Sequence, residues 1–184
     1  MKLAGDMCRV APKSDRCYAA YSGDLAPALM VHGAVADIIG PGGLRHTPLA
    51  EIFTDDGIAY LTLAPGELLV AVRVPSAPTW RSGYEKTRTR GAIDFPLVGM
   101  AVALRCEEGK LRDLRIVVTG TDSCPLLIVG LDALCAWPLD EALTRLDKLV
   151  RKHVGPMETA LTPASYSRRV GPVLARRLIY RLLG

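Results

Sequence analysis

Two runs of alternating apolar residues in the second half of the chain constrain the fold more than any other feature. The runs cover positions 98–104 and 114–118, and the segment Glu107-Glu108-Gly109-Lys110 between them has the composition of a turn. Alternation with a period of two places the apolar side chains of each run on one face of a strand. The pattern therefore predicts an antiparallel β-hairpin with one buried face.

Two segments with helical periodicity follow the hairpin. Leucine and valine recur at helical spacing over positions 139–150, with acidic residues in the first turn and basic residues in the last, as the helix dipole favours. A last helix is expected around 166–178, and Pro172 should kink or restart it because proline has no N–H to donate. A further strand is expected at 84–88. The region from about Ser82 to Gly184 is therefore predicted to be α+β, an antiparallel sheet of at least three strands covered by two or more helices on one face.

The first half of the chain predicts shorter elements. A helix is expected at 24–33, strands at 35–39 and 44–47 joined by a turn at 40–43, and a helical turn at 48–53. Segment 67–74 is apolar and rich in valine, which is typical of a buried strand. Pro75-Ser76-Ala77-Pro78 follows it and is the best candidate for a linker, so we place a domain boundary there.

Composition argues against several classes of partner. The chain has 184 residues, of which 49% are apolar, and its net charge of +4 is not gathered in one block before the last twenty positions. We therefore expect no nucleic-acid partner. No apolar run reaches the ~20 residues of a membrane-spanning helix, so no membrane partner is expected either. Five cysteines without a preceding secretory signal favour a reducing, cytoplasmic location with free or metal-bound thiolates.

Two polar segments could contact a cofactor. In Ser22-Gly23-Asp24 a hydroxyl and a carboxylate stand at an expected helix start, where they could hold a sugar or hydroxyl group; the alternative is an ordinary N-cap. Lys86, Arg88 and Arg90 alternate along an expected strand, and their common face could meet an anion such as a reduced flavin. The alternative for these cations is the solvated face of an edge strand.

Two further motifs carry weaker signals. Cys8 and Cys17 lie nine positions apart in an expected loop, and cysteine thiolates, usually four, hold iron–sulfur clusters. A structural or incidental role is the alternative for this pair. The glycine-rich segment at 40–43 could cradle a phosphate, but Pro41 removes one N–H donor and no helix follows directly. A hairpin turn is the favoured interpretation of that segment.

Three longer segments carry a resemblance to a known family. They are CYAAYSGDLAPAL at 17–29, APGELLVAVRVP at 64–75 and GYEKTRTR at 83–90. In order and spacing they resemble flavoprotein subunits of the xanthine dehydrogenase superfamily, and most closely the beta subunit of 4-hydroxybenzoyl-CoA reductase. The resemblance implies that 1–21 is the remnant of an iron–sulfur cluster loop. It implies that 22–78 is the end of a two-part FAD-binding domain and that 79–184 is the C-terminal α+β domain.

The same resemblance implies the residues that contact cofactors. Ser22 and Asp24 would contact FAD, and Lys86 would lie near the edge of the isoalloxazine ring. Leu68 and Leu69 would line the flavin, and Asp94 is a further candidate contact. The pair Cys8 and Cys17 would supply the last two ligands of a four-iron four-sulfur cluster.

The implied function is electron transfer inside a molybdenum-containing oxidoreductase of the 4-hydroxybenzoyl-CoA reductase type. The partners would be a large subunit with the molybdenum cofactor, a small subunit with two-iron two-sulfur clusters, and ferredoxin as electron donor. The chain lacks counterparts of the family's glycine-rich pyrophosphate loops and of the first two cluster cysteines, so by itself it is expected to bind neither cofactor fully. The alternative function is a non-redox scaffolding or binding module that keeps only the C-terminal fold.

Overall fold

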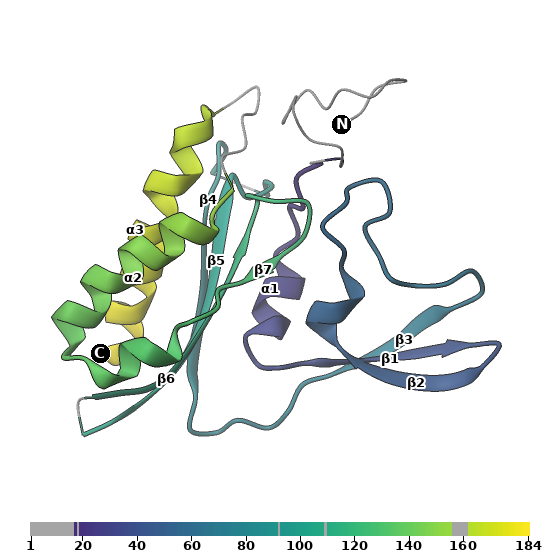
Figure 1. Cartoon of the computed structure of the whole chain (residues 1–184), viewed down its shortest axis with the longest axis horizontal. Coiled ribbons are helices and arrows are strands. Elements are labelled where there is room, and N and C mark those ends of the chain that lie inside the picture. Colours follow the sequence, from purple (N-terminus) through teal and green to yellow (C-terminus); the bar gives the residue numbers. More distant parts are fainter. Residues whose placement is uncertain (1–16, 18, 92, 109, 156–161) are drawn as a thin grey trace.

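Two antiparallel sheets form the framework of the chain (Figure 1). The computed structural model describes residues 17, 19–91, 93–108, 110–155 and 162–184. The first sheet has the strand order β2-β1-β3, with β1 (Val35–Gly40), β2 (Gly43–Pro48) and β3 (Leu68–Arg73). The second has the order β4-β5-β6-β7, with β4 (Arg81–Thr87), β5 (Val98–Glu107), β6 (Lys110–Thr119) and β7 (Leu126–Leu127). The described helices are α1 (Leu25–Met30), α2 (Leu139–His153) and α3 (Ala164–Leu183), with short 3-10 turns η1 (Leu49–Ile52) and η2 (Asp132–Ala136).

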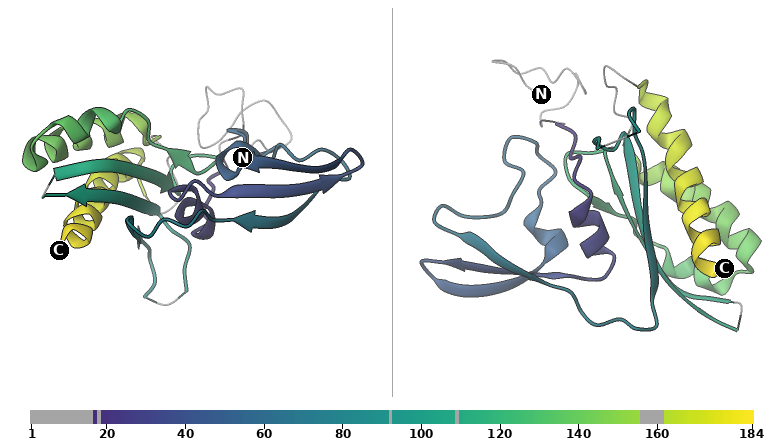
Figure 2. Two further views of the ribbon diagram at one scale, coloured as in Figure 1. Left: turned by 90° about the horizontal axis from the view of Figure 1, so that it is seen from below. Right: turned by 180° about the vertical axis from the view of Figure 1, so that it is seen from behind.

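The predicted hairpin and its helical cover are confirmed. β5 and β6 pair antiparallel along their length, and α2 and α3 lie together over one face of the second sheet (Figure 2). Fully buried side chains fill the space between sheet and helices, among them Met100, Leu104, Ile116, Leu146 and Leu178. Burying each such side chain contributes about 1.5–3 kcal/mol, so this layer is the main core of the fold. The predicted α+β class is therefore correct.

The opposite face of the second sheet carries small residues. Gly99, Ala101 and Ala103 alternate along β5 with the large core residues, and successive side chains of a strand point to opposite faces. A second core forms there, in which Ala101 and Ala103 meet Met30 of α1 and residues of β1 and η1. Because glycine and alanine add little volume, α1 and the first sheet can approach the second sheet closely. This approach brings the start of α1 beside β4.

The burial expected for segment 67–74 is wrong. The segment does form β3, but Leu68 is 64% exposed and Val70 is 50% exposed. β3 is an edge strand of a three-stranded sheet, and of its apolar residues Val72 packs against the second core. A valine-rich run predicts a strand reliably, but burial also requires a neighbouring layer, which the described residues do not place over this part of β3.

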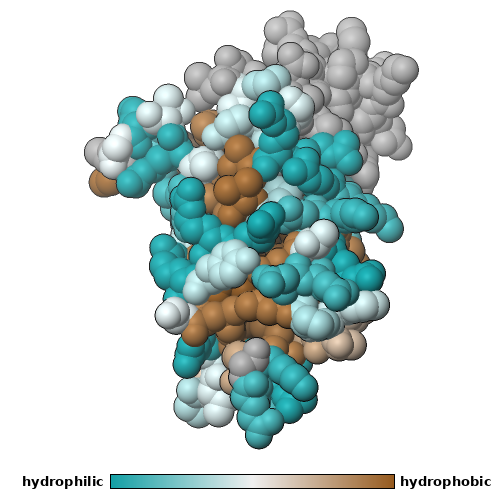
Figure 3. Space-filling model, turned by 90° about the vertical axis from the view of Figure 1, so that its left-hand side faces the viewer, coloured by the Kyte–Doolittle hydropathy of each residue, from teal (hydrophilic) through white to brown (hydrophobic). Residues whose placement is uncertain are grey.

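α3 continues through Pro172, so the expected restart of this helix is wrong. Apolar residues on both sides of the proline, including Val170 and Leu174, pack against the main core, and this packing outweighs the loss of one backbone hydrogen bond. Seen from the side of α2 and α3, charged and polar residues surround strips of apolar surface (Figure 3). None of the helices in the described part of the chain is both long and apolar enough to cross a membrane.

An ion pair joins β2 to the residue directly before β3, and it predicts how the stability of the fold depends on pH. Arg45 of β2 donates two hydrogen bonds to Glu67, with Nε–Oε1 at 2.7 Å and Nη2–Oε2 at 2.9 Å. The Arg45 hydrogen bond, with a second from the backbone N–H of Ala64, lowers the pKa of Glu67 from 4.5 to about 2. Because the folded-state pKa is depressed, this contribution to stability is present above pH 4.5 and is lost as the pH falls toward 2.

We therefore expect Glu67→Gln to lower the melting temperature at neutral pH and to make the chain less sensitive to acid. Melting temperatures of the wild type and the variant, measured between pH 5 and 2.5, should converge as the pH falls. Parallel curves would mean that Glu67 does not titrate with folding.

Candidate functional site

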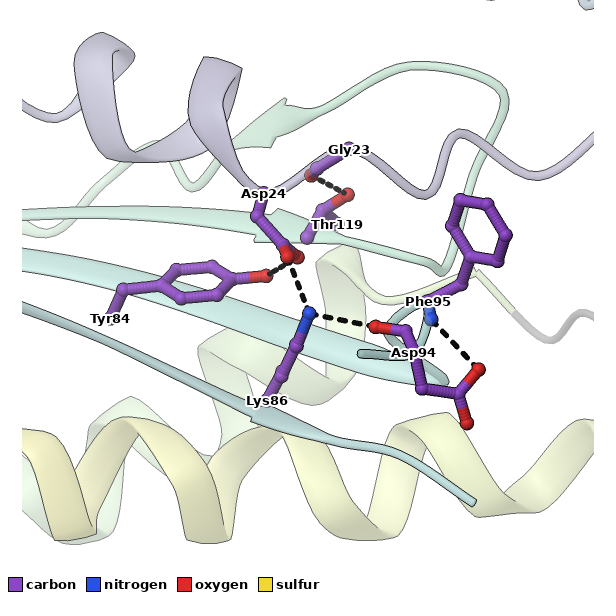
Figure 4. A network of polar contacts seen from close by, with 7 residues as sticks. All are labelled: Gly23, Asp24, Tyr84, Lys86, Asp94, Phe95 and Thr119. Carbon is purple, nitrogen blue, oxygen red and sulfur yellow. Dashed lines mark hydrogen bonds and ion pairs between the residues drawn. The ribbon is translucent and has the colours of Figure 1, made fainter. Parts of the chain in front are cut away.

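The carboxylate of Asp24 lies at the centre of a network of polar contacts (Figure 4). The Tyr84 hydroxyl donates a hydrogen bond of 2.6 Å to Oδ1 of Asp24. The ammonium group of Lys86 forms an ion pair with Oδ2, and it also donates a hydrogen bond of 2.8 Å to the backbone oxygen of Asp94. The network therefore joins the start of α1 to β4 and to the loop that follows β4.

The pattern of small residues in β5 makes room for this network. Tyr84 and Lys86 are two positions apart in β4, so their side chains share the face that points toward α1. Lys86 lies opposite Gly99 of β5, and Gly99 lies opposite Thr119 of β6. A Cβ atom at position 99 would stand 2.3 Å from the Tyr84 hydroxyl oxygen, which no real contact allows. The absence of a side chain at Gly99 therefore lets the Tyr84 ring reach Asp24.

β6 and the residues after it fix the backbone that carries Asp24. The Thr119 side-chain oxygen lies 3.2 Å from the carbonyl oxygen of Tyr21 and 3.1 Å from that of Gly23. The N–H of Gly120 donates to the same Tyr21 carbonyl at 2.8 Å, and the N–H of Tyr21 donates to the carbonyl of Asp122 at 2.8 Å. Hydrogen bonds to backbone N–H and carbonyl groups thus fix the segment 21–24, although it belongs to no helix or strand.

The ordinary interpretations are wrong for the Asp24 side chain and for Lys86, whereas Arg88 and Arg90 are exposed to solvent as the alternative expected. Asp24 occupies the N-cap position of α1, but its side chain makes no capping hydrogen bond, because the carboxylate turns toward β4. Lys86 is not part of a solvated strand face, since only 18% of its side chain is exposed. Arg88 and Arg90 do not share a strand face with Lys86 either, because β4 ends at Thr87.

Asp94 takes part in the network through its backbone and organises its own loop with its side chain. The carboxylate accepts hydrogen bonds of 2.9 Å each from the N–H and the guanidinium of Arg90 and from the N–H of Phe95. The hydrogen bonds from Arg90 hold the pKa of Asp94 well below its usual range. The Asp94 carboxylate is therefore engaged within the loop, which fixes the backbone oxygen that Lys86 contacts.

The phenol of Tyr84 stays protonated at ordinary pH. Burial raises its pKa above the usual value of 10.0, and the hydrogen bond to Asp24 raises it further. The pKa of Tyr21 is also raised, mainly by burial and to a smaller extent by the charge of Asp24. A protonated phenol can only donate to a carboxylate, so the direction of the Tyr84–Asp24 hydrogen bond is fixed.

The remaining sequence candidates do not join this network. Ser22 is half-buried two positions before Asp24, while Leu68 and Leu69 lie on β3 in the other sheet (Figure 1). Cys17 is 3% exposed, and its backbone oxygen accepts a hydrogen bond from the N–H of Gly57. Cys8 lies outside the described residues. Within the described part of the chain, no group of three or more histidine, cysteine or acidic side chains could hold a metal ion.

Sequence reasoning missed three residues of the site: Tyr84, Gly99 and Thr119. Tyr84 had a recognisable signal, because it lies two positions before Lys86 on the same expected strand. Gly99 and Thr119 had none, since their roles depend on the register of β4, β5 and β6.

Comparison with known proteins points to one kind of subunit. No family model matches the chain. The carbon monoxide dehydrogenase medium chain of Afipia carboxidovorans is 30% identical over 168 residues, which cover 86% of this chain and 56% of that protein. The aldehyde oxidoreductase FAD-binding subunit of Escherichia coli is 31% identical over 124 residues, 65% of this chain and 38% of that protein.

A solved structure gives the same result. The reconstituted CO dehydrogenase from Oligotropha carboxidovorans superposes with a TM-score of 0.80 at 25% identity, over 87% of this chain and 56% of that chain. The chain thus spans about half the length, or less, of the relatives it matches. It is homologous to the medium chains and FAD-binding subunits of carbon monoxide, aldehyde and xanthine oxidoreductases.

Proposed function

We propose that this chain is part of a flavoprotein subunit that passes electrons within a molybdenum-containing oxidoreductase, and that Asp24 and Lys86 contact its FAD. The observation that carries the proposal is the Asp24–Lys86 ion pair, which joins the start of α1 to β4 in a homologue of FAD-binding subunits. Each member of the pair was expected from the family resemblance, and the two residues are 62 positions apart in the sequence.

The residues present fit a cofactor that offers hydrogen-bond donors. An ionised carboxylate has about four acceptor positions, and Tyr84 and Lys86 each take one on Asp24. The Asp24 side chain is still 45% exposed, so its other acceptor positions are open to a ligand. FAD has ribityl and ribose hydroxyl groups that can fill them, and when bound it supplies reversible electron transfer. The protein's part is to bind, to orient and to place charge beside the cofactor.

The finer predictions from the resemblance belong to the same proposal. We propose FAD contacts for Ser22, Leu68, Leu69 and Asp94, and a division of the chain at 75–78. The partners proposed are a large molybdenum subunit and a small iron–sulfur subunit, in a cytoplasmic complex. A substrate of the 4-hydroxybenzoyl-CoA type and ferredoxin as donor stay predictions, and the relatives reported above are named for other substrates.

The described residues do not fit a four-iron four-sulfur cluster. Such a cluster normally needs four thiolates, and Cys17 is a buried free thiol that belongs to no possible metal-binding group of the described residues. The role of Cys8 and Cys17 as ligands stays a prediction, and no step of the proposed function depends on it. Iron and sulfide analysis of anaerobically purified protein tests it directly.

Flavin analysis tests the proposed function. We expect the chain, purified together with the proteins that accompany it in the cell, to contain about one FAD per chain, released on denaturation and measured by absorbance. The chain purified alone should contain much less than one, because the glycine-rich segment at 40–43 forms the turn between β1 and β2 rather than a phosphate-binding loop. An assembly without flavin would exclude the proposed function and favour a non-redox scaffolding role.

A further inference from the structure

The Tyr84 hydroxyl is the part of the network that the family resemblance did not predict. It reaches Asp24 on the small-residue face of the second sheet. Lys86 by itself could anchor one oxygen of Asp24 and leave the carboxylate free to rotate about the bond that joins it to the side chain. The second bond, from Tyr84 to the other oxygen, removes that rotation.

The surroundings of Tyr84 are shaped for this contact. Gly99 leaves the space that the hydroxyl occupies, and Thr119, the cross-strand neighbour of Gly99, anchors the carbonyl of Gly23 directly before Asp24. Lys86, Gly99 and Thr119 thus lie in one row across β4, β5 and β6. Lys86 forms the ion pair with Asp24, Gly99 leaves space for the Tyr84 hydroxyl, and Thr119 hydrogen-bonds to the backbone before Asp24. The three contributions converge on the position and orientation of a single carboxylate.

We propose that Tyr84 is a positioning residue, whose hydroxyl fixes the Asp24 carboxylate so that its remaining acceptor positions face the hydroxyl groups of a bound flavin cofactor. This inference rests on the proposed function. It assigns to Tyr84 no contact with the cofactor and no part in electron transfer. It predicts that the tyrosine hydroxyl contributes to flavin affinity only through Asp24.

A double-mutant cycle on the flavin-containing assembly tests the inference. Tyr84→Phe keeps the ring and removes the hydroxyl, and the FAD dissociation constant should rise about tenfold, the size expected for losing a hydrogen bond to a charged group. In an Asp24→Asn background, the same change should alter the dissociation constant by less than about twofold, because the anionic partner is gone. Tyr180→Phe on the exposed side of α3 is the matched control and should leave the affinity unchanged.

A second measurement needs no flavin. The ionisation of Tyr84, taken as the difference in tyrosinate absorbance between wild type and Tyr84→Phe, should occur above the usual pKa of 10.0 and should move down toward that value in Asp24→Asn. The charged groups that face this phenol are Asp24 and Lys86, with Tyr21 as a further titrating neighbour.

The outcomes separate this inference from the proposed function. A wild-type assembly that holds no flavin overturns both. An assembly that holds flavin equally well with Tyr84→Phe, or that loses the same affinity in both backgrounds, overturns the role of Tyr84 and leaves the proposed function standing. An ordinary pKa for Tyr84 would overturn the contact itself.

Discussion

Replacing Asp24 with asparagine should raise the midpoint potential of the bound flavin, and replacing Lys86 with methionine should lower it. The two side chains form an ion pair, so each substitution leaves an unbalanced charge at the same place. A remaining cation stabilises the reduced, more negative flavin, and a remaining anion destabilises it. The prediction depends on the proposed function, and its sign follows from the pairing of the two groups rather than from either group alone.

The expected size of each shift is tens of millivolts. A unit charge ~4 Å away is worth up to about 4 kcal/mol at an effective dielectric constant near 20, and solvent at the half-exposed Asp24 reduces this value. A net effect of about 1.4 kcal/mol corresponds to about 30 mV for a two-electron couple.

Spectroelectrochemical titration of the flavin-containing assembly measures these shifts. The double variant Asp24→Asn with Lys86→Met should return close to the wild-type potential, since it restores neutrality. Lys148→Met on α2, outside the network, serves as the control for loss of a positive charge. Shifts of the same sign in both single variants would show that the pair does not act on the flavin through its charge.

Replacing Leu146 with alanine should lower the free energy of unfolding by about 3 kcal/mol, within the 2–5 kcal/mol found for such changes. Leu146 lies on α2, is fully buried, and belongs to the core between the helices and the second sheet. The loss combines the transfer energy of the removed carbon atoms with the cost of the cavity they leave. A domain is stable by only about 5–15 kcal/mol, so the variant should unfold at a clearly lower denaturant concentration.

Leu44→Ala provides the matched control, because it makes the same chemical change at a residue that is 54% exposed on β2. Its effect should stay within about 0.5 kcal/mol. Urea denaturation followed by circular dichroism compares the two variants with the wild type. Equal losses for Leu146 and Leu44 would show that the core between the helices and the second sheet is not the centre of stability.

The local pattern of apolar residues was sufficient to predict a helix or strand where one face of that element is buried and the other is not. The alternation at 98–104 and 114–118 predicted β5 and β6, and the spacing of leucines over 139–150 predicted α2, because side-chain period and element geometry are directly linked. The same reasoning failed for β3. Its apolar composition predicted a strand correctly, but the exposure of Leu68 and Val70 depends on which layers lie next to it.

The site divides in the same way. The sequence, through its resemblance to flavoprotein subunits, picked out Asp24, Lys86 and Asp94 as single residues. It could not show that the Asp24 side chain, at the N-cap position of α1, pairs with Lys86 instead of capping the helix, because the two residues are 62 positions apart. It also could not show that Lys86 donates a hydrogen bond to the backbone oxygen of Asp94, or that Arg90 donates one to the Asp94 carboxylate.

By itself the sequence determined most of the helices and strands and the α+β class, and β7 and η2 were not predicted. Tertiary structure alone decided which residues of the site meet. The register of β4, β5 and β6 sets Lys86, Gly99 and Thr119 in one row, and the gap at Gly99 admits the hydroxyl of Tyr84. Register and close approach depend on contacts between segments far apart in the sequence, including the packing of α1 on the small-residue face of the second sheet. For that reason Gly99 and Thr119 could be recognised as parts of the site only in the folded chain, whereas Tyr84 could have been suspected from its spacing to Lys86.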